Sequence, residues 1–478
     1  MFALHKSVRL KRDILDTLEN TNEYLSIKQI TEILGYPSLN SVKQACTELK
    51  QQFEQLYSTE EAEFVVKVSE GIKLIRKSVN SQPLVEELFI NDLIYPLLSN
   101  LLINRTISMN LFLEENYISR STLYNRIRSL NKILNPYGLH ISLANRITLK
   151  GEEHQLRMFA YLFFFVCHRM IQFIPAITLS EQLEMEELTA DIFDYLAIPL
   201  SKNQKQKLAI FTHINNNGAK HTPLSKNSLF QSISTIRYPE KPAFLSHWSL
   251  ADWQFYVSFL YVYNAVDSTY DHQLLTKTDI VYKEDIGTWL ALFEKYVSPL
   301  DQEQKNLAQL LLDKHLIFIK NLPLEKNFLD NFKGINEKAL QQQFPEFTTG
   351  FQHFWKKLVE EKSIYQDAEY VRRMSLITAI KLIRFEDMIP TLKIYVFTDI
   401  SELHKNHFQA RLKNSLSGYT LVFVENHQEA DLIISTITFL EELKEQQRTL
   451  HVRSSFTILD MMLVEEAARQ ITHVKQKT

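Results

Sequence analysis

Glycine is scarce in this chain, with 9 glycines in 478 residues against an average usage of roughly 7%. The two closest, Gly138 and Gly151, lie 13 residues apart. The patterns G-x-G-x-x-G and G-x-x-x-x-G-K-[ST] need closer glycines, because these let the backbone approach a phosphate. The sequence therefore excludes the usual dinucleotide-binding and P-loop classes.

Cysteine is rarer still. The 2 cysteines, Cys46 and Cys167, exclude a disulfide framework and a multi-cysteine zinc site, and they fit a reducing compartment. The first residues, MFALHKSVRLKRD, lack the apolar core of a signal peptide. The longest apolar run, Met158 to Cys167, is too short to span a membrane. We expect a cytoplasmic protein with no membrane partner.

Neither sign of charge dominates, since 53 Lys and Arg residues stand against 56 Asp and Glu residues, a net charge of −3. Any nucleic-acid site must therefore be local. The hydrophobic content of 45% is that of an ordinary globular protein, with room for roughly three to five domains. No HExxH motif, cysteine cluster or nucleophile arrangement is present, so we expect no enzyme, no cofactor and no metal site.

Residues 1–78, the first winged unit, have the order helix, helix, turn, helix, hairpin. Apolar side chains recur at helical spacing over 10–18, 27–34 and 42–56. Ser26 is a suitable N-cap for the second helix, and Gly35 is suited to end it. The runs EFVVKV and GIKLIRK, separated by Ser69-Glu70, predict a hairpin. This order is typical of a winged helix-turn-helix domain.

The same order recurs in residues 79–151, the second winged unit. Apolar helical sequence extends from Leu84 to Ile103, and further helices are expected at 108–115 and 119–134. The runs LHISL and RITLK then flank Ala144-Asn145 as a second hairpin. The helix at 119–134 has an apolar face for packing and a polar face opposite it.

Residues 152–388 are predicted to be almost entirely helical, in two segments of similar length, 152–283 and 284–388. From residue 389 the strand-like runs LKIYVF, YTLVFV and DLIIST alternate with expected helices near 403–416 and 456–474. That alternation indicates a small α/β domain with a mainly parallel sheet, here residues 389–478. The predicted fold class is mainly α and multidomain, with two winged helix-turn-helix domains, two helical domains and this α/β domain.

A local excess of positive charge marks the second winged unit. Residues 101–150 contain seven Lys and Arg and two Glu, a net charge of +5. The first turns of a recognition helix meet base edges, while cations further along reach phosphates. A solvated face of a packing domain would also carry such charges, but three helices followed by a wing favour DNA recognition. The candidate DNA-binding residues are Arg120, Ser121, Thr122, Tyr124, Asn125, Arg128, Lys132 and, at the wing tip, Arg146.

The first winged unit is predicted to attract DNA less strongly. Residues 1–50 hold seven cations and six carboxylates, a net charge of +1. Lys43, Gln44 and Thr47 lie off the apolar stripe of the third helix, which makes them the candidate DNA contacts of this unit. The unit either binds DNA weakly or positions the second winged unit.

The segment YISRSTLYNRIRSLNKIL (117–134), with LKGEEHQLRMFAYLFFF (149–165) after the hairpin, resembles the second DNA-binding domain of the Mga/AtxA family of Gram-positive virulence regulators. In that family two winged domains precede two helical PTS-regulation domains and a domain similar to the IIB component of sugar phosphotransferases. The order expected here is similar over essentially the whole chain. The resemblance implies a transcription regulator, expected to act as an activator.

The resemblance makes histidines in the helical region candidate phosphorylation sites, because PTS-regulation domains in this family can be phosphorylated on histidine by the phosphocarrier HPr. The candidates are His213 and His221 in the first segment and His315 and His353 in the second. A phosphoryl group would add roughly two negative charges and could shift a dimer equilibrium. For any single histidine, a packing role satisfied by one hydrogen bond is the alternative.

The expected C-terminal domain departs from its enzymatic relatives, since residues 389–478 contain no cysteine. Phosphotransfer through a cysteine after the first strand is therefore impossible, and Thr398, Asp399 and Ser401 occupy that loop. His404 and His407 form an H-x-x-H pair without further metal ligands, so two exposed helix histidines are the favoured interpretation. We expect this domain to serve as a partner surface for homodimerisation.

The sequence thus predicts a regulator that binds double-stranded DNA, acts as a homodimer and is modulated through its helical domains, with phosphorylated HPr or another phosphotransferase protein as a partner. One alternative is a PTS-regulated RNA-binding antiterminator, although such proteins begin with a small β-rich domain. The other is a non-catalytic interaction protein.

Overall fold

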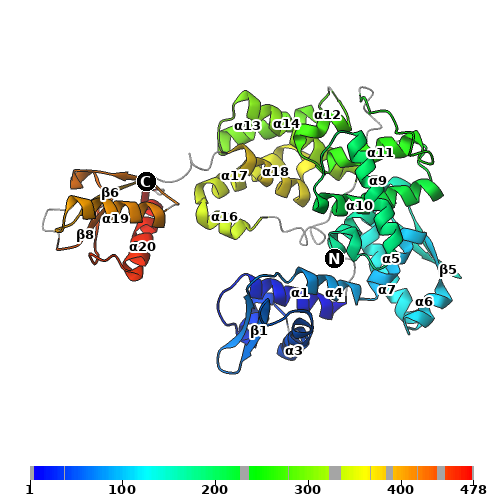
Figure 1. The fold of residues 1–478 in the computed structure, drawn as a ribbon, viewed down its shortest axis with the longest axis horizontal. Helices are drawn as coiled ribbons and strands as arrows, with labels where there is room; N and C mark the ends of the chain where they lie inside the picture. The colour runs from blue at the N-terminus through cyan, green and yellow to red at the C-terminus, as the bar shows by residue number, and fades with distance from the viewer. Residues whose placement is uncertain are drawn as a thin grey trace. The chain divides into compact units, whose positions relative to one another are not determined.

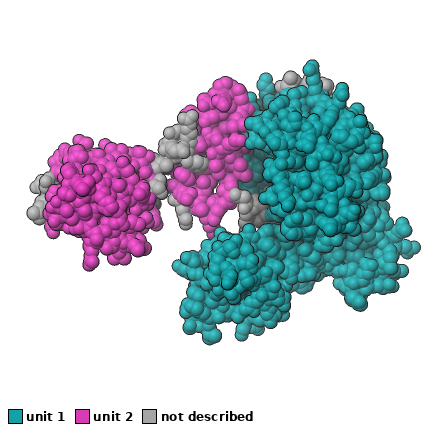
Figure 2. Space-filling model, viewed as in Figure 1, with its two compact units in different colours: residues 1–286, 309–333, 365–374 teal, residues 287–308, 334–364, 375–478 magenta. Residues whose placement is uncertain are grey.

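The computed structural model describes residues 5–36, 38–226, 236–277, 279–321, 335–366, 368–383, 391–416, 418–438 and 447–475. The chain divides into two compact units, residues 1–286, 309–333 and 365–374, and residues 287–308, 334–364 and 375–478 (Figure 2). Residues 284–388, predicted as one helical domain, contribute to both units. The predicted boundary at 388 lies outside the described residues, and the domain limits stay predictions.

The first winged unit has the predicted order of elements (Figure 1). The Ser26 hydroxyl accepts the Gln29 N–H in a capping box, and Gly35 ends that helix in the left-handed conformation at φ 63°, as expected. The hairpin is antiparallel. Its core also takes in Leu84 and Leu88 from the next helix. The elements are α1 (Lys6–Glu19), α2 (Ile27–Leu34), α3 (Leu39–Leu56), β1 (Ala62–Lys67) and β2 (Gly71–Arg76).

The second winged unit contains the predicted helices and hairpin, with two differences. The apolar stretch from Leu84 to Ile103 is broken in two between α4 and α5, where the Asp92 carboxylate accepts the Ile94 N–H at 2.9 Å. A short strand not predicted from the sequence makes the sheet three-stranded and antiparallel, in the order β3-β5-β4. The elements are α4 (Gln82–Ile90), α5 (Ile94–Asn104), β3 (Thr106–Ser108), α6 (Met109–Glu115), α7 (Arg120–Leu134), β4 (His140–Leu143) and β5 (Arg146–Lys150).

The described part of residues 152–388 is mostly helical, as predicted. An aromatic cluster packs the first of its helices, where Tyr161 contacts Phe211, Phe259 and Tyr263 at centroid distances of 5.1 to 5.5 Å. No described helix is both long enough and apolar enough to cross a membrane. The helices are α8 (Glu153–His168), α9 (Leu179–Tyr195), α10 (Lys202–His221), α11 (Leu250–Val262), α12 (Asp271–Leu274), α13 (Lys283–Tyr296), α14 (Gln302–Asn321), α16 (Glu337–Gln343), α17 (Pro345–Glu361) and α18 (Glu369–Leu382).

The C-terminal residues form the predicted α/β arrangement. Four parallel strands lie in the order β7-β6-β8-β9, which confirms the expected parallel sheet. Both helices pack apolar residues on it, including Phe408, Leu412 and Val464. The elements are β6 (Thr391–Phe397), α19 (Glu402–Ser415), β7 (Thr420–Phe423), β8 (Leu432–Ser435), β9 (Arg448–His451) and α20 (Ile458–Lys475).

Candidate nucleic-acid interface

Helix α7 begins at a built N-cap. The Ser119 hydroxyl accepts the Thr122 N–H at 3.1 Å, which satisfies one of the free donors of the first turn. Four leucine and isoleucine side chains bury one face of the helix: Leu123, Ile127, Leu130 and Leu134. Every candidate DNA-binding residue of this unit is exposed: Arg120, Ser121, Thr122, Tyr124, Asn125, Arg128, Lys132 and Arg146. The structure thus brings the seven predicted residues on α7 onto one accessible helix.

The wing is fastened to α7 by a side chain that the sequence did not single out. The Asn131 amide donates to the Ile141 carbonyl at 2.9 Å and accepts the Ile141 N–H at 2.8 Å. One residue therefore satisfies both backbone groups of a β4 position. Asn131 fixes the wing relative to α7, and Arg146 lies at the start of β5 in the same hairpin.

The charge on α7 is uncompensated. The helix carries four cations and no carboxylate, and among the described residues none of these cations has an acidic partner. Arg120 lies in the first turn, where the helix dipole already presents positive potential. A phosphate group is the natural counter-charge for such a helix start.

The polar side chains of α7 differ in availability. The Ser121 and Thr122 hydroxyls lie 2.8 and 2.9 Å from the Ser119 hydroxyl, so local bonds already engage them. Tyr124 keeps 60% of its surface exposed, and within the described residues the Asn125 amide has no side-chain partner. Tyr124 and Asn125 are thus the more available of these polar side chains.

The turn before α7 contains a strained residue. Tyr117 adopts φ 51° and is 96% exposed, whereas the equivalent turn of the first winged unit uses Gly35. The backbone bonds match, because Tyr117 N–H donates to Glu114 and Gly35 N–H donates to Glu32. A left-handed tyrosine is uncommon, and with no glycine in this stretch the sequence did not indicate it.

Helix α3 of the first winged unit presents its candidates differently. Lys43, Gln44 and Thr47 are all exposed, as predicted. However, Glu48 lies among them and receives a hydrogen bond from Gln44 at 2.9 Å and an ion pair from Lys11 at 2.8 Å. Those two bonds lower the pKa of Glu48, so the carboxylate stays charged at neutral pH. The face of α3 that holds the candidate residues therefore also holds an ionised carboxylate, which engages Gln44 and pairs with Lys11.

Arg105 serves a different purpose from that inferred from the sequence, where it was counted in the local positive excess. Its guanidinium pairs with Glu153 of α8 at 2.9 Å and bonds the Leu102 carbonyl. It therefore belongs to the junction between the second winged unit and the helices. Arg105 contributes to attachment, and the surplus available to DNA is smaller than the sequence count.

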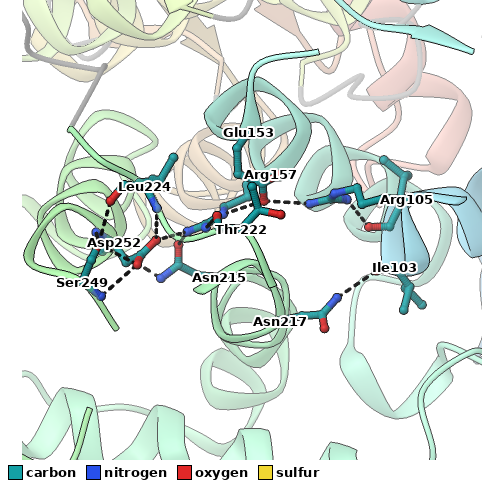
Figure 3. A network of polar contacts seen from close by, with 11 residues as sticks. Ile103, Arg105, Glu153, Arg157, Asn215, Asn217, Thr222, Leu224, Ser249 and Asp252 are labelled. Atoms are coloured by element: carbon teal, nitrogen blue, oxygen red, sulfur yellow. Dashed lines mark hydrogen bonds and ion pairs between the residues drawn. The ribbon is translucent and has the colours of Figure 1, made fainter. Parts of the chain in front are cut away.

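A buried polar network continues from that pair into the helical region (Figure 3). Arg157 pairs with Glu153 at 3.0 Å and with Asp252 at 2.7 Å, with both members of the second pair fully buried. It also donates to Asn215 at 2.8 Å and to the Thr222 carbonyl at 2.9 Å. Such charges are stable in the interior only when fully paired. The network thus connects α5, α8, α10 and α11.

Glycine at position 218 permits this network. A Cβ at Gly218 on α10 would overlap the guanidinium of Arg157. The neighbouring Asn217 amide donates to the Ile103 carbonyl of α5 at 2.9 Å, which adds a direct bond between the second winged unit and α10. One of the few glycines in the chain therefore lies where two helices require close approach.

The four candidate phosphorylation sites fall into two groups. His213 and His315 are largely buried, and burial lowers the pKa of both, that of His315 to about 3. Within the described part of the chain, each has a ring nitrogen without a hydrogen-bond partner. His221 and His353 are exposed. Only the exposed pair is accessible to a protein donor in this conformation.

His404 of α19 is held by structural contacts. His404 places Nδ1 3.1 Å from the Thr398 hydroxyl and Nε2 3.0 Å from the Ser454 carbonyl, so both ring nitrogens are engaged in structural contacts. Across the described ranges, no cluster of three or more His, Cys, Asp or Glu residues is arranged to hold a metal. The loop residue Asp399 accepts from Thr436 at 2.9 Å.

Comparison with known families bears directly on the segment containing α7. Residues 77–164 match the family model described as the Mga helix-turn-helix domain. The match covers the second winged unit and most of α8, and it supports membership of the Mga family. Comparison with curated proteins gives no match. The matched segment suggests a DNA-binding transcription regulator.

Proposed function

We propose that this chain is a transcription regulator of the Mga family, and that its second winged unit makes the principal contacts with double-stranded DNA. The observation that carries the proposal is α7, which has four cations, three of them exposed, and no carboxylate, within the Mga-matched segment. No catalytic step and no cofactor belong to this function.

Docking of α7 in the major groove assigns a role to each exposed group. Tyr124 and Asn125, near the start of the helix, would meet base edges. Arg128 and Lys132 would reach phosphates, as would Arg146 at the wing. Lys43, Gln44 and Thr47 of α3 would add weaker contacts, because Glu48 lies beside them.

A mobility-shift assay of the full chain with genomic DNA fragments tests this proposal. Arg128→Ala combined with Lys132→Ala is expected to weaken the shift markedly while the circular dichroism spectrum stays unchanged, because both side chains are exposed. Lys43→Ala combined with Thr47→Ala is the matched control and should retain most of the shift. Unchanged binding by the α7 variant would overturn the role of α7, and preference for RNA competitor over duplex DNA would favour an antiterminator.

The proposal extends to whether the chain activates or represses its promoters and to the signal that controls it. We expect activation of target promoters, with phosphorylation of exposed histidines by phosphorylated HPr as the signal. His221 lines a small cavity of about 160 Å³ with Arg105, Glu153 and Gly218. A phosphoryl group there would compete with Glu153 for Arg105. Incubation with phosphorylated HPr should label wild type and lose label in His221→Ala or His353→Ala; no histidine label would contradict it.

Homodimerisation through the C-terminal residues is the last part of the proposal. Four apolar residues at the start of α20 are 48 to 78% exposed: Ile458, Leu459, Met462 and Leu463. A stripe of this kind suits a second copy of the chain, since an isologous contact pairs it with itself. Leu459→Glu with Met462→Glu should convert a dimer into a monomer in sedimentation velocity. An unchanged sedimentation coefficient would contradict this surface.

A further inference from the structure

An open depression of about 390 Å³ lies between the start of α7 and the wing. It is bounded by the first residue of α6, by the first turns of α7 and by the end of β4. Most of its lining is apolar, although it lies on the face that carries the exposed cations. The lining residues are Met109, Arg120, Ser121, Leu123, Tyr124, Leu143 and Ala144.

The depression combines apolar contact with flanking positive charge. Tyr124 contributes a ring that is 60% exposed, while Arg120 lies in its wall and Arg146 follows two residues after its last member, Ala144. The space is open, so it would leave much of a free small molecule in water, whereas ligand pockets usually enclose most of their ligand. A flat, extended partner with small apolar projections fits it better.

We infer that this depression receives the C5-methyl groups of thymine in the major groove, so that the chain prefers base pairs that carry this methyl group. The inference rests on the proposed function. Among the four standard bases only thymine presents an apolar group in the major groove, and apolar side chains read it by contact. The N-terminal turns of a recognition helix are the part that reaches base edges.

Side chains from three elements would surround the methyl group. Met109 and Leu143 supply apolar walls from α6 and β4, and Tyr124 supplies the outer wall from α7. Leu123 is 1% exposed and forms the floor as part of the core. Met109, Leu143 and Ala144 therefore become specificity-determining candidates, in addition to the polar residues expected from the sequence.

Four duplexes of 30 base pairs test the inference with the full chain, by fluorescence anisotropy at one salt concentration. The first pair shares an A·T-rich sequence and carries either thymine or uracil, which differ only by the methyl group. The second pair shares a G·C-rich sequence and carries either 5-methylcytosine or cytosine, which place or omit a methyl at the same edge. The methylated member should bind more tightly in each pair, about fourfold per contacted methyl, as expected for burying one methyl-sized group.

Variants connect the preference to the depression. Tyr124→Ala and Leu143→Ser should each reduce the methyl preference toward equality while residual salt-dependent binding persists. Tyr124→Phe keeps the ring and should keep the preference. Leu111→Ala removes an exposed apolar residue outside the depression and serves as the matched control, with the preference expected to remain.

The outcomes separate the inference from the function on which it rests. Equal affinity for the two members of both pairs, with clear salt-dependent binding, would overturn the inference and leave the proposed function standing. Absence of binding to all four duplexes would overturn both. A preference that survives Tyr124→Ala and Leu143→Ser would also overturn the inference, because the methyl group would then be read elsewhere.

Discussion

The two winged units share a scaffold and differ in charge. Both use a serine N-cap on the helix before the hairpin, Ser38 for α3 and Ser119 for α7, and both turn through a left-handed residue before that helix. On α3 two lysines are balanced by Glu48 and Glu54, and Lys50 pairs with Glu54 at 3.6 Å. On α7 four cations have no carboxylate on the helix.

This difference shows that the buried residues that specify the fold and the exposed charges vary independently. The apolar stripes and serine caps of α3 and α7 are equivalent, and in both units that helix is followed by an antiparallel hairpin. The exposed charges are free to vary because surface ion pairs contribute little to stability, typically below about 1 kcal/mol. A pair such as Lys50 with Glu54 neutralises a helix face, whereas the unpaired cations of α7 remain available to phosphates.

The largest expected effect concerns attachment. Arg157→Leu leaves Asp252 as a buried, uncompensated carboxylate and should cost about 3–5 kcal/mol of stability. Hydrogen exchange should show loss of protection in α8, α10, α11 and the second winged unit, while the core of the first winged unit stays protected. Equal loss of protection in both winged units would contradict the prediction that only the second winged unit depends on the Arg157 network.

Charge reversal should distinguish the two recognition helices next. Arg128→Glu with Lys132→Glu is expected to weaken DNA binding by roughly 100-fold, since two phosphate contacts become repulsive. Lys43→Glu with Lys50→Glu makes the same change in charge on α3 and should weaken binding several-fold at most. Anisotropy titrations at a fixed salt concentration measure both, and equal losses would show that the units share DNA binding.

Substitutions in the turns before α3 and α7 should change stability in opposite directions. Tyr117→Gly should stabilise the second winged unit by about 1 kcal/mol, because glycine tolerates positive φ and the exposed ring loses no packing. Gly35→Ala should destabilise the first winged unit by a similar amount, although no atom lies near the added Cβ. Urea unfolding gives both values; destabilisation by Tyr117→Gly would mean that the ring makes a stabilising contact.

The smallest effect concerns Glu48. Glu48→Gln removes the negative charge from the face of α3 and should raise DNA affinity about threefold. It should also cost a little stability at neutral pH, because the folded pKa of Glu48 is lowered below its ordinary value of 4.5. That contribution is present above the ordinary pKa and is lost as pH falls through the folded pKa. The stability difference between variant and wild type should therefore disappear in acid, and a difference that persists there would exclude the carboxylate as its source.

Local sequence signals predicted much of the fold. Helical periodicity located α1 to α3 and α7, Ser26 and Gly35 marked the ends of α2, and short β-branched runs located both hairpins and three of the four parallel strands. These features depend on neighbours along the chain, so a single sequence contains them. The fourth parallel strand, β9, was not predicted. The three-residue strand β3 was missed because so short a run has no period to detect.

The exposed residues of the candidate site were predicted from the sequence, whereas the contacts that hold the site in place were missed. Helical spacing separates Arg128 and Lys132 from the buried face, which suffices for exposure. The clamp made by Asn131, the pairing of Arg105 with Glu153 and the burial of His315 depend on residues distant in sequence or on tertiary packing. No pattern of spacing identifies such partners, because they are defined only after the chain has folded.

The salt dependence of DNA binding tests the central claim most directly. The logarithm of the affinity should fall linearly with the logarithm of salt concentration, with a slope set by the number of phosphates neutralised. Arg128→Ala with Lys132→Ala should flatten that slope by about 2, and Lys43→Ala with Lys50→Ala should leave it nearly unchanged. A slope flattened by the α3 variant and unaffected by the α7 variant would contradict the assignment of DNA binding to the second winged unit.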